Sequence, residues 1–277
     1  MTTRRWRRLR MGLETVLGVR RAGFFIPYRY AATVAPPRAP YAAIEAAMAD
    51  AEPAFAALLD QIDALGDALR AIEGPPPAPR WAQDWYPRLD AAAAYALLRG
   101  APPRRVVEVG SGHSTRFVAR ALRDAGARAE HVCIDPAPRA ALAGLPTLWR
   151  AEVLSEAHLP LFAALEPGDV AFFDSSHILM PGTDVDLILN RILPVLRPGV
   201  RVHVHDVFLP DPYPPEWAWR GYNEQNALAG WILGGALRPI FSSRYALTRM
   251  QAARRPALAA LPWTGAPESA LWLERAG

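Results

Sequence analysis

Short apolar segments alternate with helical segments between residues 105 and 206, and this alternation is the feature that most constrains the fold. The apolar segments predict strands at residues 105–109, 131–134, 148–153, 169–173 and 200–204. Helices are expected between them at residues 114–125, 155–165 and 184–196. Strands that alternate with helices join by right-handed crossovers and form a mostly parallel sheet. Two further strand candidates, at residues 239–242 and 270–273, predict a doubly wound α/β sheet of seven strands.

The composition agrees with a globular protein that buries a full core. Of the 277 residues, 51% are hydrophobic and 21% are charged, which excludes an intrinsically disordered chain. Cys133 is the single cysteine, so no intrachain disulfide can form. No apolar run reaches the roughly 18 residues of a transmembrane helix, and charged residues interrupt every candidate signal sequence. We therefore expect a cytoplasmic protein.

The positive charge of the chain is confined to its start. The whole chain has a net charge of +4, whereas residues 1–30 alone carry +7, so residues 31–277 carry −3. A nucleic-acid-binding domain spreads its basic residues over a binding face, and this chain does not. We expect no nucleic acid partner.

A basic amphipathic helix is predicted within residues 1–20. Apolar residues recur there at helical spacing, with arginines on the remaining faces: Trp6, Leu9, Leu13, Val16 and Leu17. Such a helix either lies on an anionic membrane or packs its apolar side against its own protein. The sequence leaves both open, so cytoplasmic localisation with peripheral membrane contact through residues 1–20 is one expectation.

The remaining N-terminal segments predict a helical extension. Residues 23–30 are too aromatic for a free tail, and we expect them to dock on the body of the protein. Residues 41–72 predict one or two helices with a single buried side. The proline-rich run at residues 74–79 cannot be helical and forms a stiff connector. We therefore expect an N-terminal basic and helical extension with a proline-rich linker over residues 1–80, and one domain over residues 81–277.

Polar residues follow four of the predicted strands. In open α/β sheets, ligands bind in the crevice outside the carboxyl ends of the strands. Those ends carry residues 108–112, Asp135, residues 174–177 and residues 205–206. We expect these side chains to line one edge of the sheet.

The first strand end predicts a cofactor site. The glycine turn after it offers free amides at a helix start, with these residues as candidate cofactor contacts: Glu108, Gly110, Ser111, Gly112 and Ser114. A dehydrogenase fingerprint needs glycine where this chain has Thr115. Together with Glu108, that favours the amino-acid end of S-adenosylmethionine, and Asp135 after the second strand can accept both ribose hydroxyls. The alternative is a glycine turn that binds no nucleotide.

The second group of polar residues predicts a metal and a base. Asp174 and Asp206 follow strands that should be neighbours, and two carboxylates with an imidazole suit a divalent cation. We expect Asp174, His205 and Asp206 as metal ligands and His177 as general base, with Asp174 also in the catalytic group. Asp174 as a loop cap and His205 as a residue that orients a ligand are the alternatives. His203 is expected to be a buried strand histidine.

Residues 89–217 resemble the class I S-adenosylmethionine-dependent methyltransferases, with the glycine turn and Asp135 in the expected order. The run from Asp174 to His177, followed by Asp206, resembles the metal-dependent sugar O-methyltransferases of the macrocin and mycinamicin type. The resemblance implies a Rossmann-like methyltransferase fold in a bacterial enzyme, magnesium on Asp174 and a base at His177. That group usually has two adjacent acids after the fifth strand, where this chain has His205 and Asp206.

The segments after the fifth predicted strand indicate a substrate wall. They combine proline, aromatic and amide side chains, and the candidate substrate contacts are Tyr213, Trp217, Tyr222 and Asn223. Aromatic faces and fixed amides suit a sugar or a glycoside. They also suit ordinary core packing, which stays open.

The leading hypothesis is an S-adenosylmethionine-dependent O-methyltransferase that acts on a sugar hydroxyl of a glycoside or polysaccharide precursor. One alternative uses the same histidines and aspartates for iron-dependent oxidation. Another is a non-catalytic peripheral membrane or assembly protein with a vestigial cofactor site. The sequence leaves open whether the chain forms a homo-oligomer.

Overall fold

A computed structural model describes residues 3–277 of the chain. It divides into two compact units, one ending at Pro37 and one running from Arg38 to Gly277. The first unit contains helix α1 (Thr3–Val16) and a 3-10 turn at Ala31–Thr33. The amphipathic helix predicted near the N-terminus is therefore confirmed, and residues 1 and 2 of that segment lie outside the described residues.

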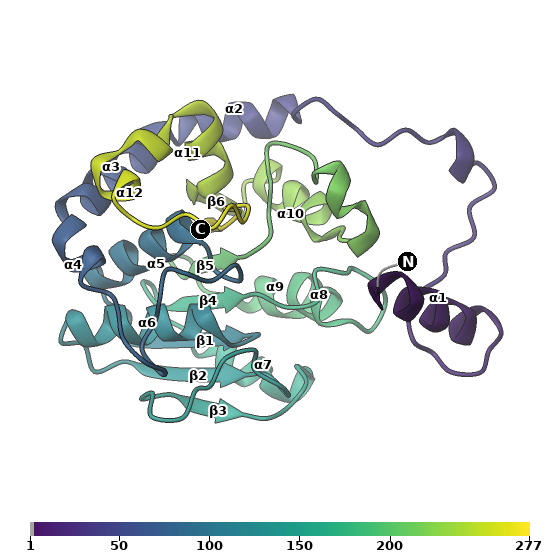
Figure 1. Cartoon of the computed structure of the whole chain (residues 1–277), viewed down its shortest axis with the longest axis horizontal. Coiled ribbons are helices and arrows are strands. Elements are labelled where there is room, and N and C mark those ends of the chain that lie inside the picture. Colours follow the sequence, from purple (N-terminus) through teal and green to yellow (C-terminus); the bar gives the residue numbers. More distant parts are fainter. Residues whose placement is uncertain (1–2) are drawn as a thin grey trace. The chain divides into compact units, whose positions relative to one another are not determined.

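The larger unit is built on a seven-stranded sheet in the order β3-β2-β1-β4-β5-β7-β6. The strands are β1 (Arg105–Val109), β2 (Glu130–Ile134), β3 (Leu148–Arg150), β4 (Val170–Phe173), β5 (Arg201–Val204), β6 (Leu237–Ser242) and β7 (Leu271–Arg275). Strands β1 to β5 are parallel, and β7 runs antiparallel to β5 and β6. Figure 1 shows β3, β2, β1, β4 and β5 following one another across the sheet. The predicted doubly wound, mostly parallel sheet of seven strands is confirmed, and it is the Rossmann-like fold of methyltransferases.

Helices cover this sheet and extend beyond it. They are α2 (Ala42–Asp50), α3 (Glu52–Ala64), α4 (Gly66–Arg70), α5 (Arg88–Gly100), α6 (His113–Asp124), α7 (Leu159–Ala163), α8 (Asp184–Leu187), α9 (Leu193–Val195), α10 (Glu224–Leu233), α11 (Ser243–Arg249) and α12 (Pro256–Ala259). A π-helical turn at Ile188–Ile192 joins α8 to α9. Short 3-10 segments occur at Glu156–His158, Pro215–Arg220 and Ala252–Arg254.

Helices α5 and α10 were not predicted from the sequence. Helix α5 is rich in alanine and buries ten of its residues, including both apolar and charged ones, so it has no clear polar side. Helix α10 likewise lacks a strong polar and apolar division. Both nevertheless carry a carboxylate that contacts a histidine of the site: Asp90 on α5 lies 3.1 Å from His205, and Glu224 on α10 lies 3.0 Å from His177.

Residues 42–72 share one hydrophobic core with the sheet. Helix α3 packs against α5, α12 and β6, and α5 packs against α6. Phe55 of α3 lies in edge-to-face contact with Phe241 of β6, with ring centroids 5.7 Å apart. A helical extension can share a core with a domain and still be distinct from it, so the boundary near residue 80 stays a prediction.

Strands β4 and β5 pair in register, so the residues that follow them lie side by side. Phe172 pairs with His203, and their rings stack with centroids 3.7 Å apart. His203 is fully buried and its Nε2 lies 3.3 Å from the hydroxyl of Tyr86, as expected for a structural histidine in a strand. Burial lowers the pKa of His203. Within the described residues, no helix is both long and apolar enough to cross a membrane.

Asp90 connects helix α5 to the sheet, and its removal should destabilise the fold. Its buried carboxylate accepts hydrogen bonds from the amides of Ser269 and Ala270, each at 3.0 Å, and lies 3.1 Å from Nε2 of His205. Asp90→Ala leaves all three donors buried without an acceptor. We expect the free energy of unfolding in urea to fall by about 3–5 kcal/mol.

The matched control is Asp50→Ala, because Asp50 is an exposed aspartate at the end of α2. It should change the free energy of unfolding by less than about 0.5 kcal/mol. Equal losses in the two variants would show that the Asp90 carboxylate does not hold α5 to the sheet.

Candidate functional site

The glycine turn between β1 and α6 is shaped by its approach to β4. Gly110 has a φ of 78°, a conformation that favours glycine. A Cβ atom at this position would collide with the backbone carbonyl oxygen of Asp174. At Gly112 a Cβ would meet only ordinary contacts. Gly110 is therefore required by the close packing of the ends of β1 and β4, whatever the turn binds.

The polar groups of the turn are arranged for a ligand. The carboxylate of Asp135 accepts hydrogen bonds from the amides of Ser111, at 2.6 Å, and Ala137, at 2.7 Å. Within residues 3–277, Oγ of Ser111 and Nδ1 of His113 are buried and find no hydrogen-bond partner. Eight other buried side-chain atoms of these residues are likewise unpaired, so these two leave room for the partners of a bound molecule but do not by themselves mark one. The residues present fit a cofactor on this turn.

Glu108 is fully buried beneath the turn. Its carboxylate accepts a hydrogen bond from Oγ of Ser114 at 2.7 Å and lies 2.9 Å from Nε2 of His131. Cys133 donates to it at 3.5 Å, and burial raises the pKa of that thiol. In this conformation Glu108 acts on the start of α6 through Ser114 and has no surface to offer a ligand. Its part in cofactor binding stays a prediction.

The ends of β4 and β5 bring together two aspartates and two histidines. Oδ1 of Asp174 lies 3.3 Å from Nε2 of His177 and 3.6 Å from Nδ1 of His205. Asp206 completes the ring through Oδ2, 3.6 Å from Nε2 of His177, and Oδ1, 3.5 Å from Nδ1 of His205. We call these four residues the Asp–His ring. All four were predicted at this edge of the sheet, and the structure places them in one group.

Each histidine of the Asp–His ring also contacts a carboxylate from outside this group, and neither of these two carboxylates was predicted from the sequence. Nδ1 of His177 lies 3.0 Å from Glu224 on α10, and Nε2 of His205 lies 3.1 Å from Asp90 on α5. Both carboxylates are buried. A carboxylate that contacts one imidazole nitrogen fixes the orientation of the imidazole, so the other nitrogen faces Asp174 and Asp206. The two histidines thus present Nε2 and Nδ1, respectively, to the aspartates.

The charges of the Asp–His ring are strongly coupled. Burial alone would lower the pKa of His177, but hydrogen bonds to Asp174 and Glu224 raise it well above its usual value. Burial likewise opposes protonation of His205, and the charges of Asp174 and Asp206 raise its pKa. Burial would raise the pKa of Asp174, but His205 and His177 hold it well below its usual value. Positive charge between the two aspartates is therefore favoured.

The backbone at two residues of the Asp–His ring lies in the left-handed region. His177 has a φ of 60° and Asp206 a φ of 55°, and Gln251 is the one other such residue besides glycine in residues 3–277. This conformation costs about 1–3 kcal/mol when the residue is not glycine, so the surroundings must hold it in place. Asn223 holds the backbone around His177. Its backbone N–H donates to the carbonyl of His177 at 3.1 Å, and its side-chain Oδ1 accepts from the backbone N–H of Leu179 at 2.6 Å.

A pocket of about 330 Å³ opens in front of the Asp–His ring, and we call it the Asp174 pocket. Its lining residues are Asp84, Trp85, Arg139, Asp174, His205, Asp206, Trp217, Arg220, Thr264, Gly265, Ala266 and Pro267. Of the candidate substrate contacts, Trp217 lines it, and the ring of Tyr222 lies 4.6 Å from that of His177. Tyr213 packs behind them, with its ring 6.1 Å from Tyr222. Their contact with a substrate stays a prediction.

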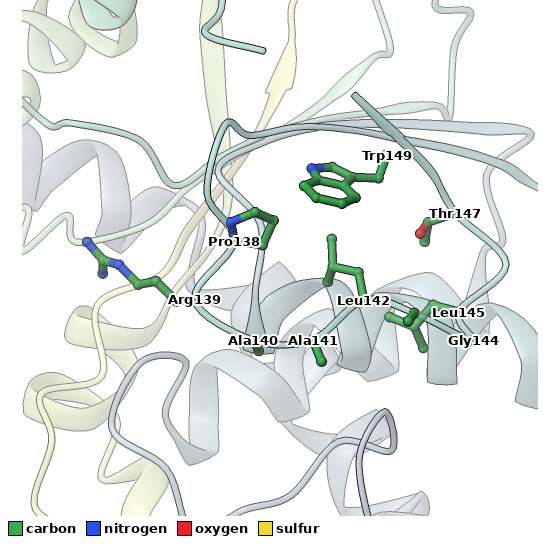
Figure 2. Close-up of a pocket in the computed structure, with 10 residues that line it drawn as sticks. Pro138, Arg139, Ala140, Ala141, Leu142, Gly144, Leu145, Thr147 and Trp149 are labelled. Atoms are coloured by element: carbon green, nitrogen blue, oxygen red, sulfur yellow. The ribbon is translucent and has the colours of Figure 1, made fainter. Parts of the chain in front are cut away.

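A larger cavity of about 580 Å³ lies under the connection between β2 and β3, lined by residues from Pro138 to Trp149 (Figure 2). None of the predicted cofactor, metal or catalytic residues lines it, so its size does not make it the site. Arg139 lines both cavities. Figure 2 shows its side chain directed away from Trp149 and Leu142.

The donor atoms of the Asp–His ring are of types that bind cations, although no three of its residues have their ligand atoms all within 4.8 Å of one another. Within residues 3–277, the one group of three metal-binding side chains with all ligand atoms within 4.8 Å of one another is Glu108, His131 and Cys133. The ring instead alternates carboxylate and imidazole atoms 3.3–3.6 Å apart. Two carboxylates and imidazoles anchored by further carboxylates are a donor set that proteins use for divalent metals. The types of donor atom in the Asp–His ring are therefore suited to a divalent metal ion.

Residues 107–207 match the model of a family described as a methyltransferase domain. The matched segment begins in β1 and includes the glycine turn, Asp135 and the Asp–His ring. The match supports a methyltransferase domain in this part of the chain. The narrower likeness to the macrocin and mycinamicin type stays a prediction. A search of curated proteins gave no match.

Solved structures with a similar fold include an S-adenosylhomocysteine-bound methyltransferase from Podospora anserina, at 17% identity and a TM-score of 0.45, covering 92% of this chain and 100% of that one. A methyltransferase-like protein from Thermobifida fusca covers 69% of this chain and 84% of its own, at 15% identity and a TM-score of 0.39. A branched-chain polyamine synthase from Thermus thermophilus covers 68% and 56%, at 18% identity and a TM-score of 0.35. All three TM-scores lie below 0.5.

Gly110 should tolerate no side chain, unlike a glycine of similar conformation elsewhere. Gly110→Ala adds both backbone strain and a collision with the carbonyl of Asp174, so the two strand ends must separate. Gly126 also has a positive φ, of 66°, but faces open space. We expect Gly126→Ala to lower the free energy of unfolding by about 1 kcal/mol and Gly110→Ala by at least about 3 kcal/mol, both measured in urea. Equal effects of the two substitutions would contradict the packing described for β1 and β4.

Proposed function

We propose that this chain is an S-adenosylmethionine-dependent O-methyltransferase that acts on a sugar hydroxyl of a glycoside or polysaccharide precursor. One observation carries the proposal. Inside the segment that matches a methyltransferase domain, a glycine turn with unpaired buried polar atoms lies next to the Asp–His ring. Neither the iron-dependent alternative nor the non-catalytic alternative is favoured by this combination.

The cofactor would bind across the ends of β1 and β2. The amides of Gly110, Ser111 and Gly112 already donate to Ile134, Asp135 and Thr115, contrary to the expectation of free amides. Oγ of Ser111 and Nδ1 of His113 would therefore meet the amino-acid end of the cofactor. The carboxylate of Asp135 is already oriented by two amides and retains lone pairs for the ribose hydroxyls. When bound, S-adenosylmethionine supplies a methyl group on a positively charged sulfur, which is a good leaving group.

The Asp–His ring would activate the acceptor hydroxyl. The acceptor oxygen would bond to the methyl carbon while the carbon–sulfur bond breaks, and Nε2 of His177 would take the hydroxyl proton. His177 must be neutral to take it, yet the surrounding carboxylates favour its protonated form. A divalent cation held between Asp174 and Asp206 would offset those carboxylates. It would also lower the pKa of the hydroxyl and orient its oxygen.

The metal would be bound by Asp174, Asp206 and Nδ1 of His205, with Asp90 fixing the orientation of His205. The resemblance suggests magnesium, which prefers oxygen ligands. An imidazole ligand also suits manganese, iron or zinc. We therefore propose a divalent metal and expect ions that accept nitrogen ligands to bind at least as well as magnesium.

Asp135 should control cofactor affinity. Replacing it with Asn removes a charged acceptor of the ribose hydroxyls, which is expected to cost about 1.5–3 kcal/mol of binding free energy, or at least about tenfold in Kd. Isothermal titration calorimetry with S-adenosylhomocysteine measures this directly, and Asp50→Asn on the surface serves as the control. If the wild-type protein binds neither S-adenosylhomocysteine nor S-adenosylmethionine, the proposed function is wrong.

Asp206 should be needed for the metal. We expect dialysed wild-type protein to bind about one equivalent of Mn²⁺ by calorimetry, and Asp206→Ala to lose that binding because one of two carboxylate ligands is gone. Asp50→Ala should bind as the wild type does. Metal dependence is refuted if methyl transfer survives chelator and Asp206→Ala has no effect on it.

We also propose that residues 1–20 contact an anionic membrane surface. The apolar stripe is exposed, with Trp6 of α1 at 60% and Leu17, just after α1, at 71%. The other members of the stripe are Leu9, Leu13 and Val16. Arginines at positions 5, 7, 8 and 10 are exposed on the same helix. An exposed apolar stripe beside clustered arginines is typical of a helix that lies in a lipid interface.

Removal of residues 1–20 should separate membrane association from catalysis. The truncated protein should lose most sedimentation with vesicles that contain anionic lipid, while it keeps methyl transfer to a soluble acceptor. Raised salt should weaken association of the full chain, because arginine attraction to the lipid is screened. Unchanged sedimentation after truncation would argue against a membrane role for this helix.

A further inference from the structure

Arg220 lies in an aromatic cage on the wall of the Asp174 pocket. The central carbon of its guanidinium is 4.1 Å from the ring centroid of Trp217, 5.1 Å from that of Trp219 and 5.3 Å from that of Tyr222. Its Nη1 donates to the hydroxyl of Tyr222 at 3.0 Å. Contacts of this kind restrict the side chain before any ligand arrives, which lowers the entropy cost of binding.

No acid neutralises this guanidinium. Within the part of the chain that the structure describes, no carboxylate oxygen lies within 4.0 Å of it, and its Nε is buried without a hydrogen-bond partner. The side chain is only partly exposed, so water does not fully replace the missing partner. An arginine fork that is oriented, half-buried and unpaired is suited to a carboxylate or phosphate that arrives from outside.

The position of Arg220 ties it to the Asp–His ring. Arg220 lines the Asp174 pocket together with Asp174, His205 and Asp206. Tyr222, which accepts a hydrogen bond from Arg220, has its ring centroid 4.6 Å from that of His177, with the two ring planes tilted by 44°. Arg139 lines the same pocket from the connection after β2, lies 4.3 Å from the ring of Trp85 and also has no carboxylate within 4.0 Å among residues 3–277. The pocket thus presents carboxylates at the strand ends and two unpaired guanidinium groups on its walls.

We propose that the methyl acceptor carries an anionic group, a phosphate or a carboxylate, and that Arg220 binds it while the hydroxyl to be methylated faces the Asp–His ring. This inference rests on the proposed function and narrows its substrate to an acidic sugar or a sugar phosphate. A neutral sugar of the same size would offer Nη2 of Arg220 only hydroxyl oxygens, which form weaker hydrogen bonds with a guanidinium than a phosphate or a carboxylate does. Arg220 is therefore a specificity-determining residue, and Arg139 on the other wall adds to the positive potential.

The test compares charged and neutral sugars by calorimetry on the full chain saturated with S-adenosylhomocysteine. The probes are D-glucose 1-phosphate, D-glucuronate and D-glucose. We expect at least one anionic probe to bind about tenfold tighter than glucose, and Arg220→Gln to remove that difference. Arg220→Lys should keep part of it, because it retains the charge but not the fork. Whichever anion binds better identifies phosphate or carboxylate as the group recognised.

Arg128→Gln is the matched control, because Arg128 is exposed in the turn before β2, at the opposite end of the strands. It should bind the probes as the wild type does. The inference is overturned if neither anion binds better than glucose, or if Arg220→Gln keeps the preference while its thermal unfolding and S-adenosylhomocysteine affinity are normal. Binding of S-adenosylhomocysteine without a preference for anions contradicts only this inference. Absence of S-adenosylhomocysteine binding contradicts the proposed function itself.

Discussion

Two carboxylates at the ends of adjacent parallel strands impose the constraint on which this site depends. Asp174 and Asp206 follow β4 and β5, which pair in register, so like charges are brought close together on the lining of the Asp174 pocket. Such a pair is unstable unless positive charge lies between. His177 and His205 supply it, and each is held in place by a further buried carboxylate, Glu224 or Asp90.

The same constraint links the two halves of the site. Gly110 packs so closely on the carbonyl of Asp174 that the glycine turn lies directly against the start of the Asp–His ring. A methyl donor held on the turn and a hydroxyl held at the ring would therefore lie close together. Positioning of this kind is the main need of a transfer in which the leaving group is already good.

Much of this arrangement could be predicted from sequence, because the signals are local. Each buried parallel strand is a short apolar run, and each ends at a polar residue such as Asp135 or Asp174. Since parallel strands end at one edge, the meeting of Asp174, His177, His205 and Asp206 followed from the strand order. The mostly parallel sheet was recovered in the same way.

The partners that hold the ring could not be predicted, because nothing near them in sequence marks them. Asp90 lies in a helix whose alanines are buried on all sides, and Glu224 lies in another with little amphipathic pattern. Their contacts with His205 and His177 arise only from tertiary packing. For Glu108 the sequence position indicated a contact with a ligand, because the residue lies next to the glycine turn. The structure instead shows it buried and paired with Ser114 and His131.

The central claim is that the glycine turn and the Asp–His ring form one methyl-transfer site. A crystal structure of the protein soaked with S-adenosylhomocysteine and Mn²⁺ tests it most directly. We predict the ribose hydroxyls on Asp135, the sulfur facing the Asp174 pocket and the metal on Asp174, His205 and Asp206. A ligand bound elsewhere, or a sulfur directed away from that pocket, would contradict the account.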